Sequence, residues 1–371
     1  MGGYGGLGES IRESVRKTAE GRRVAVAFSG GLDSGLVAAL ASECAESVVC
    51  YTCGTDGSFD VRAGKELAEA LGLPWVHCRI SKGNLEGLIR ELISATDESD
   101  PFTISYELQL FTVCKAASED VVLTGQGADE YLGGSAKFVG CSMDDYVLLR
   151  DAGIERLLDV SVPCEKRIAS YFGKTLFHPY LDDGVQRMIS DIPLEDHLPE
   201  SMDSRKSVLK EAAAGLGYPD LAFRRKKSSQ YGSGTTDLVR ALAKERGKMY
   251  NQYLASLYDE VSSGIPARGK GSVINARVDP VVKTKAELII RKEGLSPSEA
   301  VEMFYRKVIE DGGTDSVRPS RGSRRSRECR PSRRTCKSSP RIPPSPLCWT
   351  PPRPLGGKAP GRSRMRRSRW I

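Results

Sequence analysis

The stretch VAVAFSGGLDSGLVAAL, residues 24–40, leads from an apolar run through a turn of small residues into a helical pattern. Residues 23–28 have the composition of a buried strand, and residues 34–45 have the spacing of an amphipathic helix. Small residues at such a turn let backbone N–H groups surround an anion, and the helix start adds positive potential. The stretch lacks the Gly-Lys-Ser/Thr of a Walker A loop. Asp33 in the turn instead suggests a magnesium ion between the protein and bound phosphates.

The alternation of strand and helix continues along the first part of the chain. Strand patterns recur at residues 47–54, 74–80 and 120–125, and helical patterns at residues 9–21, 60–72, 84–95 and 106–118. Four rounds of strand and helix are typical of a parallel sheet with helices on both faces. We therefore predict an α/β fold with a doubly wound parallel sheet. After about residue 145 the strand patterns fade, which predicts a helical second half.

Charge is distributed unevenly along the 371 residues, which carry a formal net charge of +7. Residues 318–371 hold 17 of the 55 basic and one of the 48 acidic residues, which leaves residues 1–317 with 38 basic and 47 acidic residues, a net charge of −9. The overall charge therefore gives no indication of a nucleic-acid surface on the main body. The sequence has no run of about 18 apolar residues and no signal-peptide core, so we expect a cytoplasmic protein that does not enter a membrane.

Composition divides the chain into four parts. We predict a main domain at residues 1–261, a polar linker at 262–271, a small module at 272–313 and a disordered tail at 314–371 that is rich in Arg, Ser and Pro. In the module, alternation predicts a strand, and Asp279-Pro280 and SPSE (296–299) predict two helix starts. Two interpretations of the tail stay open. It is a nucleic-acid-binding arm or, as its abrupt change in composition favours, a nonfunctional extension from out-of-frame translation.

A second glycine-rich turn follows the strand pattern at 120–125. The stretch LTGQGADEYLGG, residues 123–134, places Gln126 and the adjacent acids Asp129 and Glu130 among glycines. Four more stretches accompany it: CGTDGSFD (53–60), FHPYLD (177–182), RKSVLKEAA (205–213) and FRRKKSSQYGSG (223–234). SGGLDS (29–34) resembles the pyrophosphate loop of the N-type ATP pyrophosphatases, or PP-loop enzymes. The whole set resembles the asparagine synthase family, over roughly residues 5–260. This resemblance implies an adenine nucleotide alpha hydrolase-like fold, ATP as a substrate and Mg²⁺ as a cofactor.

The resemblance also implies a set of ATP-binding residues. The turn that it assigns to pyrophosphate and magnesium consists of Ser29, Gly30, Gly31, Asp33 and Ser34. The positions that match residues lining the nucleotide are Phe28 and Cys53. The second loop that contacts ATP is matched by Thr124 and Gly125.

Four catalytic positions are implied in the same way. Asp129 matches an acid on the magnesium side, with Glu130 beside it, so the expected metal ligands are Asp33 and Asp129. Lys226 matches the lysine that neutralises charge on the departing pyrophosphate, a role that suits a compact ammonium group. Gln126 stands where the family has a glutamate. A glutamate can accept a proton from an attacking ammonium, whereas an amide only exchanges hydrogen bonds.

The implied reaction is ATP-dependent amide formation, as in asparagine biosynthesis. A carboxylate such as that of aspartate attacks the α-phosphorus of ATP, pyrophosphate leaves, and an amine or ammonia displaces AMP. The glutamine-hydrolysing members carry a glutaminase domain with a cysteine after the initiator Met, whereas this chain has Gly2. We therefore expect no glutaminase domain here, and nitrogen from free ammonia, a separate glutaminase or another amine.

Two other functions remain as alternatives. One is a DNA-binding regulator whose nucleotide domain senses ATP or aspartate without turnover. The other is a tRNA-modifying ATP pyrophosphatase, a group in which some members carry a metal or Fe–S site. Cys50 and Cys53, with Cys78 and Cys114 elsewhere, would be the ligands of such a site. Only one pair is closely spaced and it lies in a predicted core strand, which favours buried free cysteines.

The module at 272–313 resembles a ribbon-helix-helix domain of the RelB/DinJ antitoxin type, on INARVDPVVKTKAELIIRKEGLSPSEAVEMFYRKVI (274–309). The resemblance implies that its strand pairs with a second copy to form a ribbon in the DNA major groove, so that the chain is a homodimer. The residues that would face the bases are Val273, Asn275 and Arg277. A toxin is a further possible partner, and the other interpretation is a module used only for dimerisation.

Overall fold

The computed structural model describes residues 4–223, 232–263, 276–293 and 297–311. The chain divides into two units, Met1–Lys307 and Val308–Ile371, and the account that follows concerns the first unit. The domain boundaries expected at 261, 271 and 313 remain predictions.

A five-stranded sheet forms the centre of this unit. Its strands are β1 (Arg23–Ala27), β2 (Ser47–Gly54), β3 (Trp75–Arg79), β4 (Val121–Leu123) and β5 (Thr175–Phe177). They lie in the order β3-β2-β1-β4-β5, and every neighbouring pair is parallel. The predicted doubly wound α/β fold is confirmed. The helical second half is confirmed except at β5, whose three residues are too few to produce a strand period.

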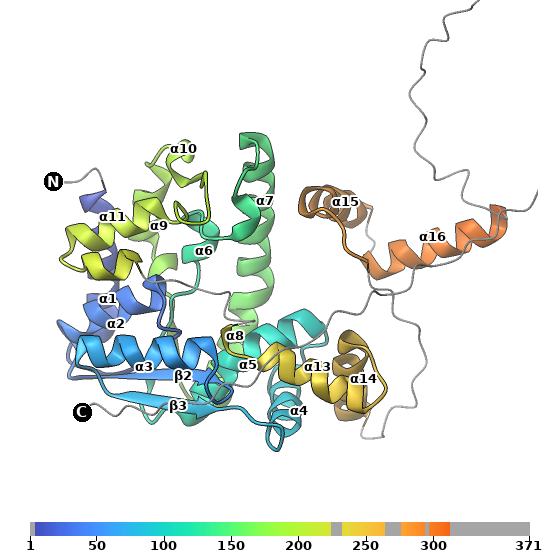
Figure 1. Ribbon diagram of the computed structural model, residues 1–371, viewed down its shortest axis with the longest axis horizontal. Coiled ribbons are helices and arrows are strands. Elements are labelled where there is room, and N and C mark those ends of the chain that lie inside the picture. The colour runs from blue at the N-terminus through green and yellow to red at the C-terminus, as the bar shows by residue number, and fades with distance from the viewer. Residues whose placement is uncertain (1–3, 224–231, 264–275, 294–296, 312–371) are drawn as a thin grey trace, which may run out of the picture. The chain divides into compact units, whose positions relative to one another are not determined.

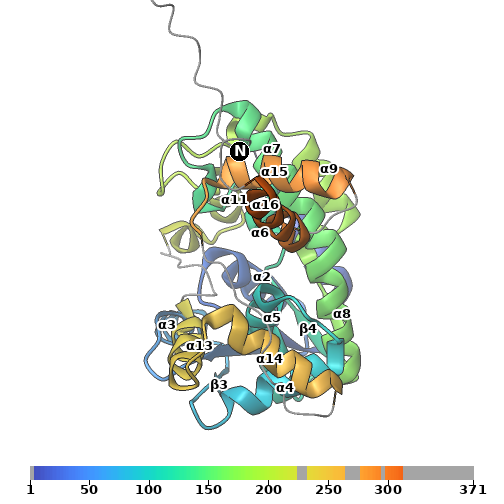
Figure 2. The ribbon, with the colours of Figure 1, turned by 90° about the vertical axis from the view of Figure 1, so that its right-hand side faces the viewer.

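Helices cover both faces of the sheet because successive strand residues point to opposite sides. Val24 and Val26 belong to one hydrophobic cluster, whereas Ala25 between them belongs to the other. The helices whose buried residues share the first cluster are α1 (Gly5–Ala19), α2 (Leu32–Ser42), α3 (Phe59–Leu71), α9 (Asp183–Ser190) and α11 (Ser207–Gly215). Those that share the second are α4 (Leu85–Thr96), α5 (Pro101–Ala116), α8 (Val162–Tyr171), α13 (Thr235–Glu245) and α14 (Tyr250–Ser263). Figure 1 shows α3 and α4 on opposite sides of β2 and β3, and Figure 2 shows α4, α5, α13 and α14 gathered together.

Shorter elements complete the described chain. These are α6 (Ala128–Tyr131), α7 (Met143–Arg156), α10 (Leu194–His197), the 3₁₀ turns Ala136–Phe138, Pro179–Leu181 and Pro219–Phe223, and a π-helical turn at Leu157–Ser161. Two further helices follow, α15 (Pro280–Lys292) and α16 (Pro297–Asp311). The predicted start of α15 is confirmed, because Asp279 accepts hydrogen bonds from Val281 N and Val282 N and Pro280 occupies the first helical position.

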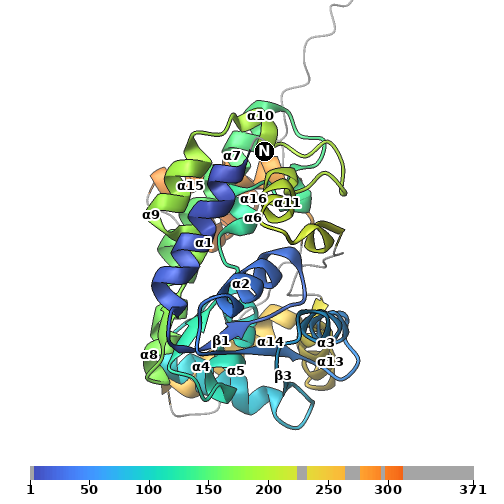
Figure 3. The same ribbon diagram turned by 90° about the vertical axis from the view of Figure 1, so that its left-hand side faces the viewer.

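Helix α2 differs from its prediction as an amphipathic helix. Every residue from Leu32 to Ala41 is buried. One side of α2 contacts β1 and β2, and the other contacts α1 and the 3₁₀ turn Pro219–Phe223. Figure 3 shows α1 beside α2 and α9. A helix covered on all sides needs no polar face, so the small residues of α2 serve close packing.

The path of the chain creates a switch point between β1 and β4. From β1 the chain proceeds outward to β2 and β3, and then returns to β4 on the other side of β1. Loops leaving the carboxyl ends of such neighbouring strands diverge, and open α/β sheets bind ligands in the resulting crevice. The two glycine-rich turns singled out in the sequence follow β1 and β4. In the described part of the chain, no helix is both long and apolar enough to cross a membrane.

Burial of α2 yields a stability prediction. Leu36 is fully buried, so Leu36→Ala is expected to lower the free energy of unfolding by about 3 kcal/mol through lost transfer energy and a residual cavity. Leu158 is 45% exposed, and Leu158→Ala should change the free energy of unfolding by less than about 0.5 kcal/mol. Urea denaturation of both variants checks the difference. Equal midpoints for the two would contradict the burial assigned to α2.

Candidate functional site

The turn between β1 and α2 forms the first wall of the candidate site. Gly30 has a φ of +72°, and a Cβ on it would lie 2.3 Å from the backbone carbon of Ala63, so only glycine fits. Gly31 is the N-cap of α2, which leaves the first N–H groups of the helix at the turn. Ser34 Oγ accepts a hydrogen bond from Ser29 N at 3.2 Å. The turn therefore offers backbone amides and hydroxyls to an anion at a helix start.

The turn between β4 and α6 forms the second wall. A Cβ on Gly125 would lie 2.9 Å from the Cβ of Asp33 and equally close to the next backbone nitrogen, so a glycine is needed for the two turns to touch. Thr124 Oγ1 accepts a hydrogen bond from Gln126 N at 3.2 Å and lies 2.8 Å from His178 Nδ1. The second turn is thereby fixed to the chain that follows β5.

Lys206 joins the two walls, and sequence reasoning gave it no role. Its Nζ lies 2.5 Å from Asp33 Oδ1 and 2.6 Å from Asp129 Oδ1, and its side chain is 7% exposed. Lys206 has a φ of +58°, an unfavourable conformation for a lysine, immediately before α11. The available signal was RKSVLKEAA (205–213), a stretch that contributed to the family resemblance. The structure thus places an ammonium group between the two acids expected to face the phosphates.

Asp33 and Asp129 also fit the expected magnesium ion. Both carboxylates line the pocket beside the first turn, and their Oδ1 atoms bind Lys206 Nζ. Mg²⁺ prefers oxygen ligands and is commonly held by one or two carboxylates together with substrate phosphates. Two pocket-lining carboxylates beside an anion-binding turn are of that ligand type, so the residues present fit the ion by their chemistry. No cluster of three or more His, Cys, Asp or Glu ligands occurs among the residues that the structure describes.

A pocket opens between the two walls at the carboxyl ends of β1, β2 and β4. It brings together ten of the residues expected from the sequence: Phe28, Ser29, Asp33, Ser34, Cys53, Thr124, Gly125, Gln126, Asp129 and Glu130. Gly30 and Gly31 shape the first turn without lining the pocket. Lys226, Val273 and Asn275 lie outside the described residues, and Arg277 is exposed on the segment before α15.

The pocket also has an acidic side that sequence reasoning missed. Tyr106 and Glu107 reach it from α5, and Glu165 reaches it from α8. Tyr106 donates a hydrogen bond to Gln126 Oε1 at 3.2 Å. Burial and neighbouring carboxylates raise the pKa values of Glu107 and Glu165. The only sequence signal for Glu107 and Glu165 was an acid on an otherwise apolar helix face. Such a pattern does not show which loop the side chain contacts.

The cysteines are free and buried, as predicted, at Cys50, Cys53, Cys78 and Cys114. Burial raises the pKa of the Cys50, Cys78 and Cys114 thiols to about 12. Burial also raises the pKa of Cys53, the one member of this set whose side chain lines the pocket. Buried, protonated thiols are poor nucleophiles, so these residues pack as small core side chains.

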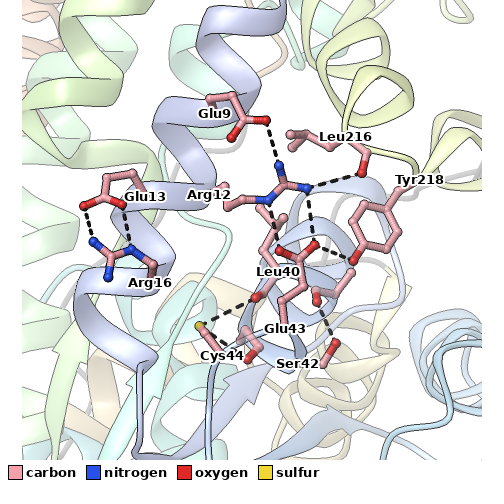
Figure 4. Close-up of polar contacts among 12 residues, drawn as sticks. Glu9, Arg12, Glu13, Arg16, Leu40, Ser42, Glu43, Cys44, Leu216 and Tyr218 are labelled. Atoms are coloured by element: carbon pink, nitrogen blue, oxygen red, sulfur yellow. Dashed lines mark hydrogen bonds and ion pairs between the residues drawn. The ribbon is translucent and has the colours of Figure 1, made fainter.

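A polar network joins α1, the C-terminal end of α2 and the residues that follow α11 (Figure 4). Arg12 of α1 bonds Glu9 at 2.7 Å and Glu43 at 2.9 Å, and its other nitrogen donates to Leu216 O at 3.4 Å. Tyr218 OH donates to Glu43 at 2.8 Å. Because Leu216 and Tyr218 directly follow α11, this network ties the C-terminal end of α11 to α1 and α2.

Comparison with known proteins identifies two regions. Residues 6–146 match the family model for asparagine synthase, and residues 271–314 match the model for RelB antitoxin. A protein of Methanocaldococcus jannaschii named as a putative glutamine-hydrolysing asparagine synthetase is 29% identical in an alignment of 300 positions that covers 69% of this chain and 55% of that protein. The carboxyethyl-arginine beta-lactam-synthase of Streptomyces clavuligerus is 30% identical over 224 residues, or 60% of this chain and 43% of that protein.

These matches support the asparagine synthase domain inferred from the motifs. The chain spans about half the length of the curated relatives that it matches. Among solved structures, the NMN synthetase of Francisella tularensis is 16% identical, with 75% of this chain and 87% of that chain covered and a TM-score of 0.34. A likeness at that level says nothing about activity.

The contact between the two turns gives a binding prediction. Gly125→Ala should push the walls apart and weaken binding of Mg²⁺-ATP by at least about tenfold, which corresponds to roughly 1.4 kcal/mol. Gly87 in α4 has open space around its Cβ position, so Gly87→Ala is the matched control and should bind as the wild type does. Isothermal titration calorimetry measures both affinities. Unchanged affinity in Gly125→Ala would show that ATP does not bind between these turns.

Proposed function

We propose that this protein is an ATP-dependent ligase that activates a carboxylate as its adenylate, with release of pyrophosphate, and converts it to an amide with release of AMP. The observation that carries the proposal is the position of Lys206 between Asp33 and Asp129 at the sheet's switch point. The match of residues 6–146 to asparagine synthase supports it.

The first turn and Lys206 suit the departure of pyrophosphate. The amides at the start of α2 and the hydroxyls of Ser29 and Ser34 would bind phosphate oxygens. Lys206 is buried and already oriented, so its charge is available without reorganisation when negative charge develops on the leaving group. Asp33 and Asp129 would hold Mg²⁺, and when bound that ion would supply neutralisation of phosphate charge. The chain's contribution is positioning and charge stabilisation, with no covalent nucleophile.

The products of the relatives define the proposed substrate class. Their names denote the synthesis of asparagine and of a β-lactam, and both products contain an amide. We propose an aspartate-like carboxylate as acceptor and ammonia or another amine as nitrogen donor. The acidic side of the pocket, with Glu107, Glu130 and Glu165, offers a proton acceptor to an attacking amine.

A turnover assay tests the proposal. With ATP, L-aspartate and ammonium chloride or glutamine, we expect AMP and pyrophosphate in equal amounts. Lys206→Met should reduce kcat by roughly a hundredfold or more, because it removes a preorganised charge at the leaving group. Lys210→Met, one turn further along α11, is the matched control and should keep wild-type activity. Formation of ADP in place of AMP would contradict the proposal, and AMP formation that requires tRNA would favour the tRNA-modifying alternative.

A second candidate function, DNA binding in a regulator, is favoured by the RelB antitoxin match at residues 271–314. We expect a chain truncated before the basic tail to shift DNA in a gel, and Arg277→Ala to weaken that shift by about 1–3 kcal/mol. Sedimentation of the same truncated chain tests the proposed homodimer. A truncated wild type that binds all sequences equally weakly, or none, would leave dimerisation as the only role for this segment.

A further inference from the structure

Two buried carboxyl groups face the pocket beside the ATP-binding turns. Glu107 of α5 is 1% exposed and Glu165 of α8 is 3% exposed, and the two carboxyls are close enough for each to affect the pKa of the other. Both line the pocket. Glu107 Oε1 is buried and has no hydrogen-bond partner among the described residues. A buried oxygen without a partner is costly, so its presence at a pocket wall points to a bound group that completes it.

His178 lies between the two buried glutamates and the second ATP-binding turn. Glu165 Oε2 lies 3.1 Å from His178 Nε2, although not in hydrogen-bond alignment, and His178 Nδ1 lies 2.8 Å from Thr124 Oγ1 in the second ATP turn. Burial lowers the pKa of His178 to about 4, so its imidazole is neutral. The pair therefore shares one polar cluster with the turn that is expected to hold ATP.

The charges that act on the pair are mainly negative. The pKa of Glu165 is influenced by Glu107 and Glu130. The negative charge of Glu98 raises the pKa of Glu107, whereas the cation Arg156 and a hydrogen bond from Ser161 lower it. Burial, and then repulsion between the acids, raises the pKa of both carboxyls. No Lys or Arg lines the pocket among the residues described. Two adjacent buried carboxyls in such surroundings hold at least one proton between them near neutral pH.

We propose that Glu165, which lines the pocket beside Glu107, accepts the proton from the amine that attacks the acyl-adenylate. This inference rests on the proposed ligase function and deepens it by assigning the missing base. Gln126 occupies the position where an acid was expected, and its amide oxygen receives a hydrogen bond from Tyr106. An amide does not accept a proton near neutral pH, whereas Glu165 in its ionised form does, and its raised pKa makes that form a stronger base than an ordinary carboxylate.

The step balances with the residues present. The lone pair of a neutral amine forms the C–N bond at the acyl carbon. The bond from that carbon to the phosphate oxygen breaks, and its electron pair leaves on AMP. The proton released from nitrogen passes to the ionised carboxyl of Glu165, whose burial favours the protonated form. Adenylation needs no such proton transfer, so the two half-reactions depend on Glu165 differently.

That difference is the basis of the test. With L-aspartate as acceptor, ATP–pyrophosphate exchange reports adenylation, and product formation with ammonium chloride reports amination. Glu165→Gln should keep aspartate-dependent exchange and lose amide formation by about a hundredfold, with a rate that no longer rises with pH. Glu119→Gln is the matched control, because Glu119 is a buried glutamate at the opposite end of β4, outside the pocket, where it accepts a hydrogen bond from Tyr51. It should keep both half-reactions.

A rescue variant separates a chemical role from a structural one. Adding Gln126→Glu to Glu165→Gln returns a carboxylate to the same pocket and should restore part of the amide-forming rate. Equal loss of exchange and amination in Glu165→Gln, or no loss of either, would overturn the assignment.

A measurement without substrate keeps the failure of this inference distinct from failure of the ligase proposal. A carboxyl whose pKa is raised in the folded state contributes stability that is complete below its unfolded pKa, near about 4.3, and is lost as pH rises through the folded pKa. Wild type should therefore lose more free energy of unfolding than Glu165→Gln as pH rises from about 4.3 through neutrality. If aspartate supports no exchange, the ligase proposal fails for that acceptor. Independently of that result, parallel profiles of unfolding free energy against pH for wild type and Glu165→Gln would show that Glu165 does not hold a proton in the folded state, and would overturn this inference.

Discussion

The ion pairs of Lys206 with Asp33 and Asp129 hold the candidate site together. They connect the start of α2, the turn after β4 and the start of α11, which are far apart in the sequence. Lys206 adopts a left-handed conformation that costs on the order of 1–3 kcal/mol, so its surroundings must fix it there. A Cβ on Gly134 would lie 2.1 Å from both Asp129 Oδ1 and Lys206 Cε, so the contact requires glycine at that position. A buried charge of this kind is destabilising once a partner is lost, which makes the three segments interdependent.

The order of the strands explains why these segments meet. Because β4 lies beside β1, the loops after both strands leave the sheet at the same edge. These loops are in contact because Gly125 has no side chain to separate them. The second half of the chain then contributes α11, which α1 and the Arg12 network fix against α2. Surface ion pairs such as Arg12–Glu43 stabilise little individually, so burial of α1 against α2, α9 and α11 is the larger contribution to this arrangement.

The sequence predicted most reliably those features that depend only on residues adjacent in the chain. Apolar runs followed by glycine turns indicated the strands before the two walls, and Asp279-Pro280 indicated a helix start, because capping depends on neighbours in the chain. Burial of α2 on all sides was not predictable, since it depends on α1 and on a turn near residue 221. Lys206 and the Glu107–Glu165 pair were missed for the same reason. Each acts through a partner more than 50 residues away, and no period within its own helix marks that partner.

The site therefore has a phosphate side, built from a helix start and a lysine held by two acids, and an acidic side, built from buried glutamates. An enzyme that joins a carboxylate to an amine through an adenylate uses both: the first for a departing anion and the second for a proton. The central claim is that the carboxylate oxygen attacks the α-phosphorus of ATP. Turnover of a carboxylate acceptor labelled with ¹⁸O in its carboxyl group tests this directly, with mass spectrometry of the nucleotide product. We predict AMP that carries one ¹⁸O atom from the acceptor. Unlabelled AMP, or label found in phosphate together with ADP, would contradict the account.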